Sequence, residues 1–102
     1  TSAMLRAGAD GGATGENAVA VCCREADVIL GPIGIALADA LLGEITPRMA
    51  QAVANSRALK VLVPVGRCRV KVAGTADLSL SAATEDAVRI AARHILEKDI
   101  QR

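Results

Sequence analysis

The sequence predicts an α/β domain in which helices cover both faces of a short parallel sheet. Two short apolar segments, residues 28–30 and 59–65, lack the polar alternation of a half-exposed strand. Such segments are typical of strands that are buried on both faces. Helical patterns lie between and around them, and a strand, a helical crossover and a parallel strand form a right-handed βαβ unit. The length of 102 residues fits one domain.

The N-terminal part of the chain predicts two helices with no strand before them. Residues 1–8 predict a short helix, and a second helix is expected from Glu16 to about Glu25. In a parallel α/β fold the first helix normally follows a strand. We therefore expect that residues 1–102 form a single domain that lacks its N-terminal β-α unit, or that a partner chain takes the place of this unit.

Two further helices are expected between the predicted strands. The first covers residues 36–43 and ends at Gly43. The second covers residues 46–56, with Thr46 as the N-cap and Pro47 at the first helical position. A proline is favoured there because its missing N–H has no partner in the first turn of a helix.

The C-terminal third predicts an exposed strand and a long helix. Charged and apolar residues alternate over residues 67–73, which indicates an edge strand or an antiparallel strand with one exposed face. A final helix is expected to begin at Ser81 or Thr84 and to continue to about Lys98. Four residues are expected to form its inner face: Val88, Ala91, Ala92 and Ile95.

Composition and charge exclude several classes of partner. The chain has 12 Lys and Arg against 11 Asp and Glu, and no aromatic residue that could stack on a base, so no nucleic-acid partner is expected. It shows no signal peptide and no apolar segment of membrane-spanning length, so we expect no membrane partner and a cytoplasmic location. Residues 45–76 carry six basic groups and no acidic one, which suits a small anion or an acidic face of another subunit.

The apolar core is expected to be thin. The chain contains 21 alanines and no Phe, Tyr or Trp, so each contact between a helix and the sheet buries little apolar area. Association would add buried surface, and we therefore expect a homo-oligomer.

Four segments carry a family resemblance: "AGADGGATGENAVAV", "ADVILGPIGI", "LLGEITPRMA" and "RCRVKVAG". In this order and spacing they resemble a family of small uncharacterised bacterial proteins, a domain of unknown function with a Rossmann-like α/β fold. Longer members begin with a strand and a turn of the form G-Q-G-G-G-I-G, which this chain lacks. Asp39 and Gly66 stand where the family usually has Asn. The resemblance implies a Rossmann-like fold and no particular activity.

Three loops predict a shared ligand site at the carboxyl ends of the parallel strands, where open α/β sheets bind their ligands. One is the turn from Gly31 to Gly34, one follows the second strand and reaches Arg67, and the third holds Thr14 as a helix cap. The predicted ligand-binding residues are Thr14, Gly15, Asn17, Gly31, Pro32, Gly34 and Arg67. The sequence identifies no cofactor; a small anionic metabolite, phosphorylated or nucleotide in kind, fits this site.

The sequence is compatible with two functions. The first is a binding module for a small anionic ligand. The second is a self-associating interaction module whose glycines only form tight turns, because neither glycine turn has the GxGxxG or the GxxxxGK[ST] pattern. In that case the acidic first third of one chain is expected to meet the basic middle third of a neighbour.

We predict no catalytic residue and no metal site. Cys68 lies between two arginines, but strand alternation places its side chain with Val70 and Val72 on the opposite face. His94 lies near the end of a helix, where the helix dipole favours a cation. An enzyme is therefore the less favoured class.

Overall fold

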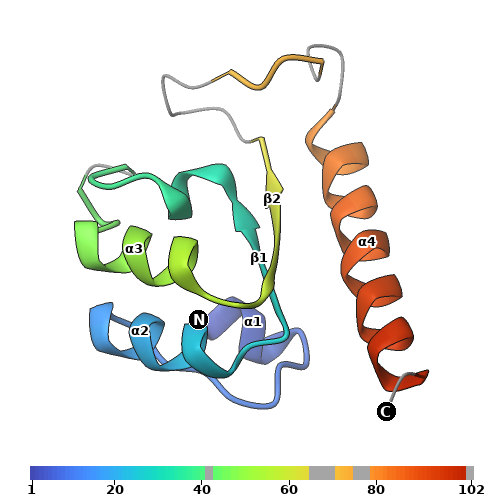
Figure 1. Cartoon of the computed structure of the whole chain (residues 1–102), viewed down its shortest axis with the longest axis horizontal. Helices are drawn as coiled ribbons and strands as arrows, with labels where there is room; N and C mark the ends of the chain where they lie inside the picture. Colours follow the sequence, from blue (N-terminus) through green and yellow to red (C-terminus); the bar gives the residue numbers. More distant parts are fainter. Residues whose placement is uncertain (41–42, 65–70, 75–78, 101–102) are drawn as a thin grey trace.

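A computed structural model describes residues 1–40, 43–64, 71–74 and 79–100. The described elements are α1 (Ser2–Arg6), α2 (Glu16–Glu25), β1 (Val28–Pro32), η1 (Ile33–Ala36), α3 (Pro47–Asn55), β2 (Leu59–Val63) and α4 (Leu80–Ile100). Helices α2 and α3 lie on one side of the two strands and α4 lies on the other (Figure 1). This arrangement confirms the predicted α/β class.

The two strands pair in parallel, as predicted. The register runs from Val28 opposite Leu59 to Pro32 opposite Val63. The Leu59 N–H donates to the Asp27 carbonyl at 3.2 Å. The backbone N–H and C=O groups of successive residues in a strand point to alternate edges of the sheet. Since the Asp27 carbonyl points to β2, the backbone of Pro32 faces the edge away from β2. Its missing N–H therefore costs no bond between the strands, and β1 extends beyond the predicted end at residue 30.

Helix α4 forms the core with one face of the sheet. Val61 and Val63 pack against Ala83 and Ala87, and Val28 joins this cluster at its margin. Apart from Gly34, every buried residue in the described part of the chain is Ala, Val or Cys. The core is therefore thin, and the small side chains let helix and sheet approach closely.

Helix α3 begins as its sequence predicts. Pro47 is its first residue, and the Thr46 hydroxyl accepts a hydrogen bond from the Met49 N–H at 3.2 Å. At its other end, the Ser56 hydroxyl donates to the Cys23 carbonyl of α2 at 2.6 Å. This bond joins the C-terminal ends of the two helices.

The predicted helix over residues 36–43 is wrong in its described part. The chain instead forms the short 3-10 helix η1 directly after β1, and turns follow. Asp39 has a φ of 64°, a left-handed conformation that an α-helix cannot contain. Its N–H donates to the Ile45 carbonyl at 2.6 Å, which closes the loop. This turn outweighs the helix propensity of the Ala and Leu residues in the segment.

Helix α4 begins earlier than predicted and buries a different face. Ser79 caps it, since its hydroxyl accepts a hydrogen bond from the Ala82 N–H at 3.1 Å, so the predicted start at Ser81 or Thr84 is wrong. The buried residues are Ala83, Ala87 and Ala91. Of the predicted inner face only Ala91 is buried, while Val88 and Ile95 are 52% and 45% exposed. The alanine side of the helix can approach β2 more closely than a face with Val and Ile.

The predicted edge strand at residues 67–73 falls mainly on positions 67–70, which lie outside the described residues. Residues 71–73 form no strand. None of the described helices is both long enough and apolar enough to cross a bilayer.

The contact between α4 and β2 predicts a size limit at Ala87, which is 5% exposed. Ala87→Leu is expected to lower the free energy of unfolding by about 1–3 kcal/mol, because the added methyl groups have no space beside Val61 and Val63. The exposed neighbour Ala92 supplies the matched control: Ala92→Leu is expected to change stability by less than about 0.5 kcal/mol. Urea unfolding followed by circular dichroism measures both. Equal effects of the two substitutions would contradict the described packing.

Candidate functional site: an apolar hollow and a cationic cleft

An apolar hollow of about 580 Å³ lies beside β1, bordered by α2, η1 and α3. We call it the β1 hollow. Apolar side chains from all four elements and from the loop before α3 line it, among them Val19, Leu30, Ile35, Ile45, Met49 and Val53. Glu44 is the one charged side chain among its described lining residues. Such a lining suits apolar groups better than an anion.

The structure brings two of the three predicted loops to this hollow. Thr14 and Gly15 line it, and so do Leu30 and Ile35, which flank the Gly31–Gly34 turn. Asn17 is exposed in the first turn of α2, and it is not among the described residues that line the hollow. An anion contact at these positions stays a prediction.

The other predicted ligand residues have different positions. Gly31 and Pro32 belong to β1, and Gly34 is buried within η1. Arg67, the predicted counter-charge, lies outside the described residues. A Cβ added at Gly31 would lie 3.0 Å from the Ile35 Cδ1 atom, so Gly31 lets η1 fold back over the strand. Gly31 is therefore explained by a tight turn, without a ligand.

The expected cap by Thr14 is wrong. Gly15 takes the N-cap position of α2, with a φ of 113° that favours glycine. The Thr14 hydroxyl instead makes a hydrogen bond with the Thr1 hydroxyl, with 2.6 Å between the two oxygen atoms. The positive φ of Gly15 turns the chain so that Thr14 contacts the start of α1 rather than the amides of α2.

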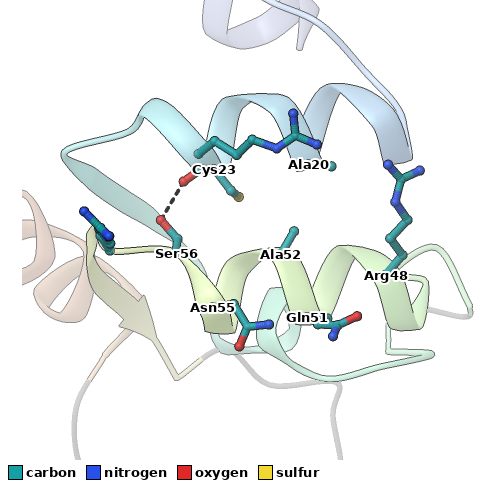
Figure 2. A pocket seen from close by; sticks show the side chains of 9 residues that line it. Ala20, Cys23, Arg48, Gln51, Ala52, Asn55 and Ser56 are labelled. Atoms are coloured by element: carbon teal, nitrogen blue, oxygen red, sulfur yellow. Dashed lines mark hydrogen bonds between the residues drawn. The ribbon is translucent and has the colours of Figure 1, made fainter.

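A second cavity, of about 390 Å³, lies between α2 and α3. We call it the α2–α3 cleft (Figure 2). Its charged lining residues are Arg24, Arg48 and Arg57, and its neutral polar ones include Gln51 and Asn55. Sequence reasoning identified the basic middle third of the chain but not this cleft, because Arg24 belongs to the acidic first third and joins the others only through helix packing.

One end of the cleft carries an ion pair between the two helices. A nitrogen of the Arg48 guanidinium lies 3.3 Å from a carboxylate oxygen of Glu16. A hydrogen bond with the Thr46 side chain and the contact with Arg48 lower the pKa of the Glu16 carboxyl below its ordinary value. Thr46 therefore caps α3 and also contacts the first turn of α2.

The described cysteines differ in exposure. Cys22 is exposed and Cys23 is buried, and both line the β1 hollow. Burial raises the pKa of the Cys23 thiol, and the neighbouring Cys22 raises it further. Cys68 lies outside the described residues. Among the residues described, no group of His, Cys, Asp and Glu side chains could hold a metal ion.

A parallel strand pair between helix layers, with an open hollow and a cationic cleft, defines a small α/β domain. The chain belongs to the family described as Domain of unknown function (DUF3842), whose family model matches residues 1–96. This match confirms the resemblance to a domain-of-unknown-function family. No curated protein and no solved structure matches the chain.

The Glu16 contacts predict a measurable change of pKa. Arg48→Gln is expected to raise the pKa of Glu16 toward its ordinary value, because a positive neighbour is lost. Arg93→Gln, the same change on α4, is expected to leave that pKa unchanged. The NMR shift of the Glu16 carboxyl carbon during a pH titration measures it.

Because its pKa is lower in the folded domain, Glu16 stabilises the fold to a degree that depends on pH. The contribution of Glu16 is present above the pKa of the unfolded chain and is lost as the pH falls through the lower pKa of the folded domain. An unchanged Glu16 pKa in Arg48→Gln would show that the pair has no electrostatic effect.

Proposed function

We propose that this domain is a protein-interaction module that self-associates through the free edge of β1 and the β1 hollow. The observation that carries the proposal is an unpaired strand edge beside an apolar cavity. In the described chain, β1 pairs with β2 alone. Its other edge borders the hollow.

The free edge offers backbone groups for a further strand. The Asp27 carbonyl accepts a hydrogen bond from β2. Because backbone groups of successive residues point to alternate edges, the N–H and C=O groups of Val28 and Leu30 point to the outer edge. A strand added there would gain main-chain hydrogen bonds and also bury apolar side chains. Rossmann-like sheets, which the family resemblance implies, contain more than two parallel strands, and this edge is available for sheet extension.

Apolar side chains beside the free edge stay accessible in the described domain. Ile29 in β1 and Ile35 in η1 are both partly exposed. Leu30, at the free edge, is 47% exposed. A partner surface would therefore cover apolar area that the domain leaves open.

A second copy of the chain is the partner that we propose. Two β1 strands related by a twofold axis pair antiparallel, so the same surface serves both copies and the assembly closes as a dimer. The joined sheet then contains four strands from the described parts of the two chains, and three or more strands suffice for a stable sheet. The expected attraction between the acidic first third and the basic middle third of two chains belongs to this proposal, and the salt dependence of the dimer tests it.

Leu30→Lys is expected to convert the dimer to a monomer, because a lysine at a strand edge opposes pairing. Leu96 is 62% exposed on α4 and away from the hollow, so Leu96→Lys is the matched control and is expected to stay dimeric. Sedimentation velocity measures the mass, and circular dichroism checks that each variant folds. A monomeric wild-type chain, or a dimer that Leu30→Lys leaves intact, contradicts the proposal.

A small anionic ligand at the strand ends is a second candidate function. Its support is that two of the three predicted loops meet at the β1 hollow, through Thr14 and Gly15 on one side and Leu30 and Ile35 on the other. The apolar lining of that hollow counts against it, which is why it ranks second. If it is correct, phosphate-bearing compounds raise the melting temperature, and Arg67→Ala abolishes that rise while Arg93→Ala does not. A thermal-shift screen with nucleotides, sugar phosphates and simple carboxylates measures this. A rise that persists in Arg67→Ala excludes the predicted counter-charge.

A further inference from the structure

We propose that the α2–α3 cleft binds a phosphate-bearing small molecule, with its arginines recognising the phosphate group. This site is separate from the strand ends and from the β1 hollow, so it goes beyond the proposed function. Three features of the cleft support this proposal: its shape, its unbalanced charge and the polar groups of α3.

The cleft lies between two contacts that join the helices. The hydrogen bond from Ser56 to the Cys23 carbonyl joins the helices at one end, and the pair of Arg48 with Glu16 joins them at the other. Between these ends the helices face each other through alanines: Figure 2 shows Ala20 and Ala52 beside the gap. No bulky side chain fills the space, so about 390 Å³ remains.

The charge of the cleft is unbalanced. Of its three arginines, Arg48 pairs with Glu16, while Arg24 and Arg57 form no ion pair with a described carboxylate. Arg24 lies in the last turn of α2, where the helix dipole favours a cation. Arg48 lies in the first turn of α3, where the dipole opposes one. A bound anion would offset the positive charge that Glu16 leaves uncompensated.

Neutral donors complete the site. Gln51 and Asn55 lie one turn apart on α3 and line the cleft (Figure 2). Guanidinium groups match the oxygen pairs of a phosphate, and side-chain amides can donate further hydrogen bonds to it. Charge and donor geometry therefore favour phosphate.

The composition sets the specificity of this site. The chain has no Phe, Tyr or Trp, so the cleft has no aromatic face on which a base could stack. Recognition is therefore directed at the phosphate group and not at the rest of the ligand. Pyrophosphate and ADP should bind with similar affinity, and adenosine should not bind.

The test is an NMR titration of the full chain with pyrophosphate, ADP, inorganic phosphate and adenosine. We expect shifts of the Gln51 and Asn55 side-chain amides with pyrophosphate and ADP, at affinities within about threefold of each other. Arg24→Gln and Arg57→Gln are each expected to weaken binding about tenfold, the effect of one charge-assisted hydrogen bond. Arg93→Gln is the matched control and is expected to bind as the wild type does.

Other outcomes separate this site from the alternatives. Loss of binding in Arg67→Ala with retention in Arg24→Gln would place the anion at the strand ends and overturn the proposal. ADP binding far tighter than pyrophosphate would overturn the stated specificity, and so would adenosine binding. No shift with any phosphate compound overturns the site itself. Leu30→Lys is expected to bind pyrophosphate normally, so failure of the cleft and failure of the dimer are distinguishable.

Discussion

The close contact between the alanines of α4 and the valines of β2 is the constraint on which the rest of the structure depends. Ala83 and Ala87 pack against Val61 and Val63, and these small side chains bring the helix near the strand pair. Without aromatic residues the chain cannot fill a wider space between layers. The other side of the strands carries α2 and α3 (Figure 1). In the described part of the chain, the β1 hollow is lined by residues of these two helices, β1 and η1, and by none of α4.

The sequence predicted the elements whose signals are local. The start of both strands, the bounds of α2 and the start of α3 agree with the structure, because apolar runs and the Thr46-Pro47 pair act over a few residues. Residues 36–40 did not follow their helical propensity, since the left-handed Asp39 and its bond to Ile45 depend on the loop as a whole. The predicted inner face of α4 is wrong because periodicity indicates where apolar residues lie along a helix. It does not indicate which of them are small enough for the short distance between α4 and β2.

The candidate sites show the same difference between local and tertiary signals. The glycine turns could be located in the sequence, and Gly31 is explained by its contact with η1. The cleft could not be located, because Arg24, Arg48 and Arg57 are brought together only when α2 packs beside α3. The sequence does show that two of these arginines lie near helix ends, since Arg24 is in the last turn of α2 and Arg48 in the first turn of α3. Spacing along the chain does not show which helices pack side by side.

Apart from Cys23, the hollow and the cleft are lined by different residues of the same two helices. On α3, Met49 and Val53 line the hollow, whereas Gln51 and Asn55 line the cleft. This division follows from an amphipathic helix, whose apolar and polar residues lie on different faces. A strand added beside β1 would therefore cover apolar side chains and leave the arginines accessible. Cys23 lines both cavities, so the two sites share one buried side chain of α2 while their charged and apolar residues stay apart.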